Sequence, residues 1–176
     1  MTSVDRASPS FAALEEAWSA QDGARTGAIE LLVARLGGGD HRCLTEAELC
    51  PERGLIGDRW ERGEQPSLGR QITLMDVRVA QLVCAGKEMH LSGDNLLVDL
   101  DLSEVALPVG SDLRVGSVCL RVTQEPHRGC KIFAARFGLD ALKWVNWRAH
   151  RPRRLRGVNC QVITGGTVEI GDCLRR

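Results

Sequence analysis

Residues 113–123, Leu-Arg-Val-Gly-Ser-Val-Cys-Leu-Arg-Val-Thr, decide the fold class. Two β-rich runs, 113–115 and 118–122, flank Gly116-Ser117, a two-residue turn typical of β-hairpins. In the second run, large apolar side chains alternate with smaller or polar ones, which is the period of a half-buried strand. The stretch therefore predicts an antiparallel hairpin.

A second hairpin is predicted near the C-terminus, where residues 158–163 and 168–170 are separated by Gly165-Gly166. Shorter strand-like runs lie at 28–33, 71–75 and 96–100, whereas residues 41–69 are polar and rich in turns. The predicted helices are short and few: residues 11–20 after a Ser10 cap, 77–84 after an Asp76 cap, 130–137 and 140–147.

Short strands with tight turns and few helices indicate a mainly β, α+β domain with a barrel-like or sandwich-like core. The strands do not alternate with long helices, which argues against a doubly wound α/β sheet. Residues 1–24 form a separate N-terminal extension, predicted as an amphipathic helix because Phe11, Leu14 and Trp18 share one face. Residues 25–176 are predicted to form the β-rich domain, which should stay folded without residues 1–22.

The composition is that of an ordinary globular protein of 176 residues, 43% of them hydrophobic. The net charge is zero, but the last 34 residues hold eight basic and two acidic side chains, which favours an anionic ligand. Few aromatic residues and a zero net charge argue against nucleic-acid binding. Seven cysteines without a CxxC pair, and no apolar run long enough to span a membrane, indicate a reduced, cytoplasmic protein.

Residues 124–138, Gln-Glu-Pro-His-Arg-Gly-Cys-Lys-Ile-Phe-Ala-Ala-Arg-Phe-Gly, are the candidate functional segment. Cys130 lies where a strand-like run gives way to a helix-like one, and His127, Arg128 and Lys131 surround it with cations that favour a thiolate. Gly129 is expected to let the chain turn and a ligand approach. The alternative is that Cys130 is an inert, buried cysteine, as many free cysteines are.

Two arginine-rich stretches are candidates for anion binding. The run 151–156, Arg-Pro-Arg-Arg-Leu-Arg, is either a solvated face or a phosphate-binding surface, with Arg156 best placed to turn inward. Asp58 and Arg59 adjoin in a turn and form either a structural ion pair or a ligand contact.

Taken in order, several motifs resemble the MOSC family, named after the C-terminal domain of molybdenum cofactor sulfurases, over about residues 27–174. They are Gly54-Leu-Ile-Gly-Asp-Arg59, Arg70-Gln-Ile-Thr-Leu74, Gly93-Asp-Asn-Leu-Leu-Val98, Leu113-Arg-Val-Gly116, Glu125-Pro-His-Arg-Gly-Cys130, Arg156-Gly-Val-Asn-Cys-Gln-Val162 and Val168-Glu-Ile-Gly-Asp172. The resemblance implies a β-barrel of the pyruvate-kinase insert type with two or three short helices. Two departures stand out: many members carry Pro-x-x-Pro-Cys where this chain has Pro126-His-Arg-Gly-Cys130, and several have arginine in place of Asp94.

The same resemblance implies that Cys130 carries persulfide sulfur, acts as a nucleophile or ligates molybdenum. His127 is expected to be a second catalytic residue, because it would help to favour the Cys130 thiolate. It implies either a sulfurtransferase or a component of a molybdenum-cofactor-dependent reductase, with a cysteine desulfurase as sulfur donor. The pyridoxal-phosphate domain of the full-length sulfurases is absent from this chain. The residues expected to bind the molybdopterin or another small anion are Asp58, Arg59, Arg70, Asn95, Arg128, Lys131 and Arg156.

Two readings therefore remain open. In the first, Cys130 is accessible and lines the main pocket, where Arg59, Arg70 and Arg156 converge, while Cys119 and Cys160 lie on strands. In the second, the protein is a non-catalytic module that holds a phosphorylated or sulfated small molecule, and Cys130 is inert.

Overall fold

The computed structural model describes residues 8–21, 23–63 and 66–176. The helices are α1 (Phe11–Ser19), α2 (Val77–Cys84), α3 (Lys131–Phe137) and α4 (Leu139–Asn146), with 3-10 helices η1 (Arg59–Arg62), η2 (Leu68–Arg70), η3 (Met89–Ser92) and η4 (Arg148–Arg153). The strands are β1 (Ile29–Gly37), β2 (Asp40–Leu44), β3 (Glu46–Cys50), β4 (Gly54–Leu55), β5 (Ile72–Asp76), β6 (Leu96–Val98), β7 (Asp112–Val115), β8 (Val118–Val122), β9 (Val158–Thr164) and β10 (Gly166–Glu169).

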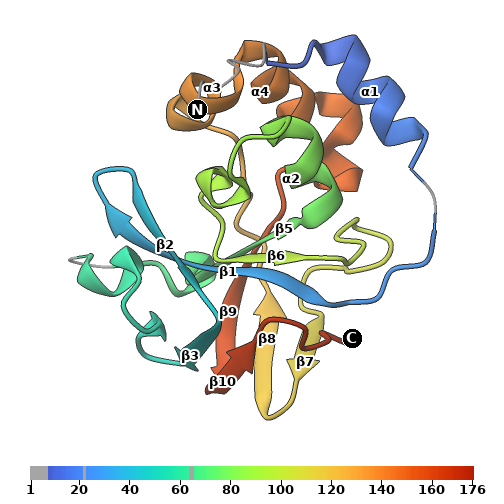
Figure 1. Cartoon of the computed structure of the whole chain (residues 1–176). Helices are drawn as coiled ribbons and strands as arrows, with labels where there is room; N and C mark the ends of the chain where they lie inside the picture. The colour runs from blue at the N-terminus through green and yellow to red at the C-terminus, as the bar shows by residue number, and fades with distance from the viewer. Residues whose placement is uncertain (1–7, 22, 64–65) are drawn as a thin grey trace.

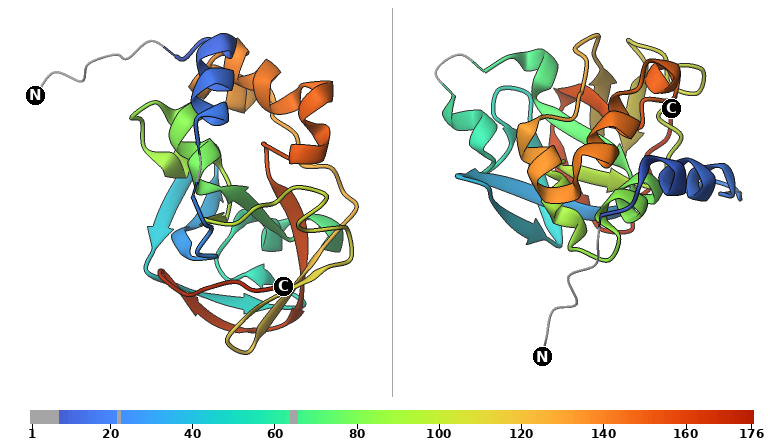
Figure 2. Two further views of the ribbon diagram at one scale, coloured as in Figure 1. Left: turned by 90° about the vertical axis from the view of Figure 1, so that its right-hand side faces the viewer. Right: turned by 90° about the horizontal axis from the view of Figure 1, so that it is seen from above.

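Two sheets and a group of helices form three layers. The main sheet has seven strands in the order β2-β1-β6-β5-β9-β8-β7, and the small sheet has three in the order β10-β3-β4. Strands β5 and β6 run parallel, and the other neighbours are antiparallel. All four α-helices of the described chain lie at the end away from the small sheet, in both side views (Figures 1 and 2).

The alternation of side chains along the central strands builds two cores, because neighbouring residues on a strand point to opposite faces. Leu74 and Leu96 point toward the small sheet and join the first core, together with Val168 of β10. Met75 and Leu97 point the other way, into a second core beneath the helices. Each fully buried side chain of this kind contributes about 1.5–3 kcal/mol to folding.

Several predicted elements are confirmed. The hairpin at 113–122 is β7–β8, joined at Gly116-Ser117. Helix α2 begins after Asp76, whose carboxylate accepts the backbone N–H of Arg78. Helix α1 begins after Ser10, whose hydroxyl accepts the N–H of Ala13. These elements were readable because capping and hairpin signals depend only on residues a few positions apart.

The predicted second hairpin is wrong. Strand β10 pairs with β3 across the small sheet instead of folding back on β9. The chain changes sheet at Gly165, where a Cβ would come within 2.6 Å of the Leu49 carbonyl oxygen, so β3 packs directly against the glycine pair. The sequence predicts a polar, turn-rich stretch at 41–69, but nearly all of β2 and the whole of β3 and β4 lie there. The strand signal of β2 is weak because its side chains are largely exposed and polar.

The predicted α+β class with predominant sheet is confirmed, but closure into a barrel is not. Among the described strands, pairing of the main sheet ends at β2 on one side and β7 on the other. Helix α1 occupies the predicted N-terminal extension, while residues 1–7 and 22 of that extension lie outside the described residues. No helix within the described ranges has the length and apolar character needed to cross a membrane.

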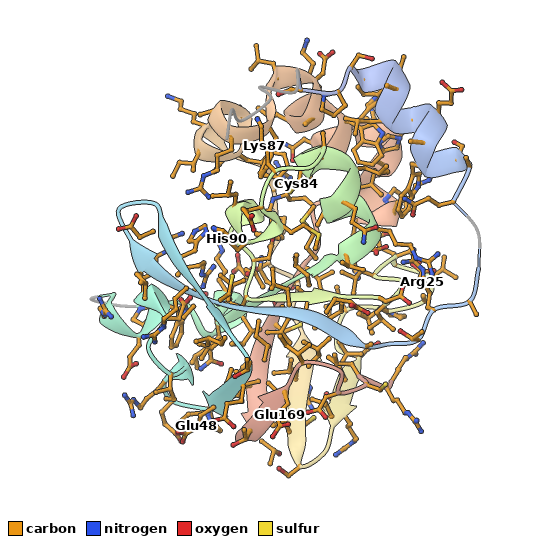
Figure 3. All side chains as sticks on the ribbon, in the orientation of Figure 1. Arg25, Glu48, Cys84, Lys87, His90 and Glu169 are labelled. Carbon is orange, nitrogen blue, oxygen red and sulfur yellow. The ribbon has the colours of Figure 1, made fainter. Side chains whose placement is uncertain are left out.

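Ion pairs connect the segment that follows α1 to the β-rich domain. Arg25, labelled in Figure 3, binds Asp76 at 2.8 Å and Asp99 at 3.2 Å. Asp99 also accepts Arg78 at 3.0 Å. The segment after α1 is therefore held against the ends of β5 and β6 by ion pairs.

Candidate functional site

The segment from β8 to α3, residues 123–130, forms the wall between two polar pockets. The first pocket, about 340 Å³, lies between this segment, η4 and the loop before β7. The second, about 520 Å³, lies on the other side, toward β1 and η2. Pro126, His127 and Arg128 line both pockets, which together form the cleft. The candidate segment of the sequence therefore lies in the middle of this cleft.

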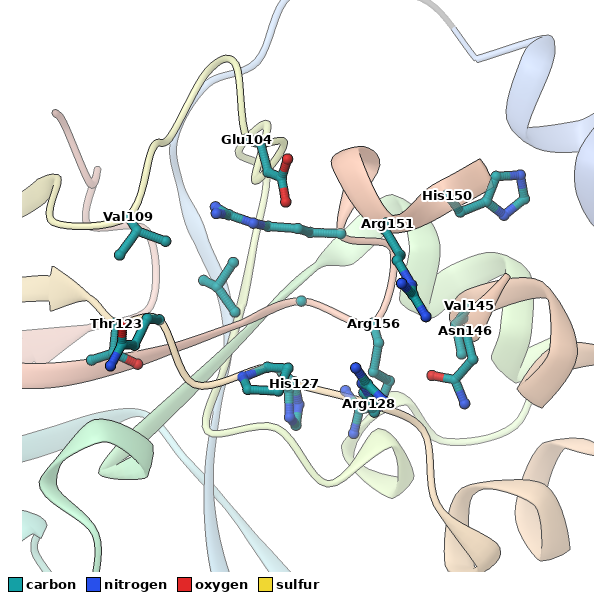
Figure 4. Close-up of a pocket in the computed structure, with 15 residues that line it drawn as sticks. Glu104, Val109, Thr123, His127, Arg128, Val145, Asn146, His150, Arg151 and Arg156 are labelled. Carbon is teal, nitrogen blue, oxygen red and sulfur yellow. The ribbon is translucent and has the colours of Figure 1, made fainter. Parts of the chain in front are cut away.

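The first pocket is rich in arginine (Figure 4). Arg128 and Arg151 line it, and the guanidinium group of neither has a hydrogen-bond or ion-pair partner among the described residues. Arg154 donates to the Leu107 carbonyl oxygen at 2.6 Å, which leaves its charge without a carboxylate. Glu104 is the one carboxylate in the described lining. The excess of positive charge suits an anionic ligand, because unpaired guanidinium groups favour carboxylate or phosphate.

The second pocket has a buried polar floor. Arg35 is 8% exposed and forms two parallel hydrogen bonds to Asp58, at 2.9 Å each. Asn95 donates to the same carboxylate at 2.9 Å and accepts from the Thr73 hydroxyl at 3.1 Å. Burial raises the pKa of Asp58, but the hydrogen bonds and charge of Arg35 outweigh burial and lower it. Asp58 and Asn95 thus fix Arg35, which lines the pocket together with Thr73.

A second buried charge cluster lies behind His127. Arg156 donates from Nη1 to both oxygens of Asp94, at 2.8 and 2.7 Å, and from Nη2 to the Ser92 carbonyl oxygen. Its guanidinium group also lies 5.0 Å from the centre of the Phe133 ring. Nε2 of His127 lies 2.7 Å from Asp94. Asp94 is fully buried, so its charge is balanced inside the protein.

Cys130 is exposed and immediately precedes α3, while Cys119 and Cys160 are buried on β8 and β9. The predicted accessibility of Cys130 and the predicted strand positions of Cys119 and Cys160 are confirmed. The expected position of Cys130 in the pocket lining is not seen, since neither lining includes it.

Gly129 serves packing rather than ligand approach, contrary to the sequence interpretation. A Cβ at this position would lie 2.7 Å from Leu142 and 3.2 Å from Val145, both on α4. The Asn146 side chain accepts the Gly129 N–H at 3.0 Å and donates to its carbonyl oxygen at 3.1 Å. Helix α4 therefore holds the segment that leads to Cys130.

The three arginines do not converge with Cys130 in one pocket, contrary to the prediction. Arg156 lines the first pocket and Arg70 the second, where Arg70 binds Glu125 at 2.9 Å. Arg59 is exposed on η1 and lines neither pocket. Burial and nearby cations, Arg59 among them, lower the pKa of His41. Lys131 is exposed at the start of α3, beside Cys130.

Sequence reasoning missed Arg35 and the role of Asp94. Arg35 interrupts the apolar run of β1, and a charge within such a run signals a buried ion pair. The sequence marks Asp94 only as a departure from a family motif. Its partners are 33 and 62 positions away, so no local pattern marks them.

Comparison with known proteins identifies the family. The sequence model of the MOSC domain matches residues 80–175, more than half of the chain. The chain belongs to the MOSC domain family. Its match covers β6 to β10, including the cleft wall and Cys130. No curated protein sequence matches the chain.

Solved structures similar to this MOSC protein share its fold at low sequence identity. The YuaD protein from Bacillus subtilis is 17% identical with a TM-score of 0.56, over 84% of this chain and 93% of its own. YiiM from Geobacillus stearothermophilus is 16% identical with a TM-score of 0.58, over 85% and 73%. YiiM from Escherichia coli is 18% identical with a TM-score of 0.57, over 84% and 68%. At these identities the likeness establishes the fold alone.

The MOSC family is associated with the molybdenum cofactor, which places a metal and an anionic group side by side. Among the described residues, no group of three or more His, Cys, Asp and Glu side chains could hold a metal ion. A metal would therefore need to bring most of its ligands with it, as a cofactor-bound metal does. The exposed Cys130 thiol would serve as one soft ligand of such a metal, and the unpaired arginines of the first pocket would bind the negatively charged part of the cofactor.

Proposed function

We propose that this MOSC protein binds an anionic small molecule of the molybdenum cofactor class in the cleft and presents Cys130 to it. One observation carries the proposal: the segment that forms the wall of both pockets ends at an exposed cysteine. Arg128 and Arg151 would hold the negatively charged group, since neither is neutralised by a carboxylate of the described chain.

In this proposal Cys130 is the sulfur-bearing group. As a thiolate it either ligates the metal or accepts sulfur as a persulfide from a donor such as a cysteine desulfurase. When bound, the cofactor would supply oxygen-atom or sulfur chemistry at its metal. The arginines and His127 would bind and orient it.

The proposal is tested by elemental analysis of freshly purified protein for molybdenum and sulfane sulfur. We expect one or both in the wild type and loss of both in Cys130→Ser. Cys173→Ser is the matched control, because Cys173 is also exposed but forms a β-bridge to Ala28 and is not part of the segment that leads to α3. Equal contents in both variants would contradict the role of Cys130.

A second function is favoured by the absence of Cys130 from either pocket lining. In that case the protein is a binding module for a phosphorylated or sulfated small molecule, and the thiol is inert. Anion binding would then be the same in the wild type and in Cys130→Ser, with neither molybdenum nor sulfane sulfur in the wild type.

A further inference from the structure

His127 occupies the wall between the two pockets, and its ring has two different environments. Nε2 lies 2.7 Å from Oδ1 of Asp94. No described residue hydrogen-bonds Nδ1, and this nitrogen is not among the buried polar atoms that lack a partner. The side chain is 15% exposed and lines both pockets. Nδ1 is therefore the ring nitrogen available to a ligand.

The buried partner determines which nitrogen carries the proton. Burial raises the pKa of Asp94, but the charge of Arg156 and the hydrogen bond from His127 outweigh it and lower the pKa to about 2. Asp94 is therefore an anion at neutral pH and can only accept a hydrogen bond. The proton between the two side chains belongs to Nε2, and Nδ1 keeps the lone pair whenever the ring is neutral.

The charges around His127 keep the ring neutral in the absence of a ligand. Burial and the charge of Arg156 lower the pKa of His127, although Asp94 raises it. The charged groups that act on the ring are Arg156, Asp94 and Arg35, and Arg70 and Arg128 line the same pockets. Arg35, Arg70 and Arg156 are each paired with a carboxylate, so Arg128 is the unpaired charge among these five described residues, and an anion bound beside it would favour a proton on Nδ1.

We propose that the Asp94–His127 pair is a general base for a ligand that carries both a negative charge and an ionisable O–H or N–H group. Arg128 and Arg151 hold the negative charge, and Nδ1 takes the proton. The electron pair stays on the ligand oxygen or nitrogen, and the imidazolium ion that forms lies against the Asp94 carboxylate. Asp94 is a positioning residue, because it acts through His127. The inference rests on the cleft of the proposed function but does not involve Cys130.

The protonation state is tested without any ligand by long-range ¹H–¹⁵N NMR on the full chain labelled at histidine. We expect His127 to carry its proton on Nε2 at pH 7 and to titrate below the usual range of histidine. Carbethoxylation by diethylpyrocarbonate, which attacks an unprotonated ring nitrogen, should modify His127 in the native protein. His150 is the internal control, since it is 3% exposed and both its nitrogens lie against acceptors. A proton on Nδ1, or an unreactive His127, would overturn the assignment.

Proton transfer is tested with 4-nitrocatechol sulfate, a probe with a sulfate group and a phenol whose ionisation changes its absorbance. At a pH where the free probe is mainly the phenol, we expect the bound probe to show at least twofold more phenolate in the wild type than in His127→Gln. Arg151→Met should weaken binding of the probe several-fold.

The outcomes separate the two proposals. If the probe binds equally and shows equal phenolate in the wild type and in His127→Gln, the base role is wrong and the anion-binding cleft stands. If the probe does not bind, the anion-binding part of the proposed function fails, and the NMR and diethylpyrocarbonate results alone decide the state of His127. Circular dichroism of His127→Gln verifies that the fold is intact.

Discussion

Asp94 and Arg156 lie 62 positions apart, yet one guanidinium nitrogen of Arg156 contacts both carboxylate oxygens of Asp94, at 2.8 and 2.7 Å. Both side chains are almost completely shielded from water. The pair connects the loop before β6 to the start of β9, behind the wall of the cleft. The pair therefore stabilises the fold behind the cleft, and it also fixes the Asp94 carboxylate that contacts Nε2 of His127.

Arg156→Met should lower the free energy of unfolding by about 3–5 kcal/mol, because it leaves the Asp94 anion buried without its main partner. Chemical denaturation measures the change. Arg121→Met is the matched control: its partner Asp112 is on the neighbouring strand and both side chains are partly exposed to water, so the loss should be much smaller than for Arg156→Met. Equal losses in the two variants would show that Asp94 and Arg156 contribute no more than a surface pair.

The same pair predicts the acid stability of the protein. The pKa of Asp94 is lowered from 3.8 to about 2, so the folded state holds the carboxylate as an anion more strongly than the unfolded state does. This stabilisation is complete above the unfolded pKa and is lost as pH falls through the folded value. It amounts to about 2 kcal/mol, lost between about pH 4 and pH 2. Denaturation of Asp94→Asn across this window should show a weaker pH dependence than the wild type.

If Cys130 is the functional thiol of the proposed site, it should react with iodoacetamide at pH 7 faster than the other exposed cysteines, because a functional cysteine attacks as the thiolate. Site mapping by mass spectrometry measures the rates, with exposed Cys43 and Cys173 as references. Burial raises the pKa of Cys84 and of Cys160 to about 12, so these two should remain unmodified in the native state. A rate at Cys130 no higher than at Cys173 would favour the inert thiol.

Arg151→Met should weaken binding of inorganic phosphate or sulfate several-fold, as measured by calorimetry at low salt. Arg148→Met is the control, because Arg148 is exposed on the same 3-10 helix but does not line the pocket. Arg70→Met tests the second pocket: its bond to Glu125 is exposed, so the variant should keep its stability within about 1 kcal/mol. Unchanged anion binding in both Arg151→Met and Arg70→Met would contradict a cleft that binds anions.

Removal of residues 1–22 should leave a folded β domain of reduced stability. No residue of α1 belongs to the core between the two sheets, but Leu14 is 1% exposed in the core beneath the helices. Glu15 also accepts the Trp144 indole N–H at 2.8 Å and lies 3.0 Å from His150. Leu14→Ala alone should cost about 2–5 kcal/mol. Loss of all β-sheet signal in circular dichroism after truncation would show that α1 is essential to the fold.

The sequence by itself determined the elements whose signals are local. The β7–β8 hairpin follows from Gly116-Ser117 between two alternating runs, and helix α2 follows from the Asp76 cap. It also singled out the segment 124–138, of which Pro126, His127 and Arg128 line both pockets. These features were accessible because turn and capping chemistry depend on residues within a few positions of one another.

Only the tertiary structure decided which distant groups meet. Strand β10 pairs with β3 and not with β9, and the Asp94 carboxylate contacts Arg156 and His127. The physical reason is that strand pairing and ion pairing across long separations in sequence depend on how all layers pack, and a buried charge selects its partner by the free energy of leaving water. A residue type and its neighbours predict that such a charge needs a partner, whereas the fold determines which partner it has.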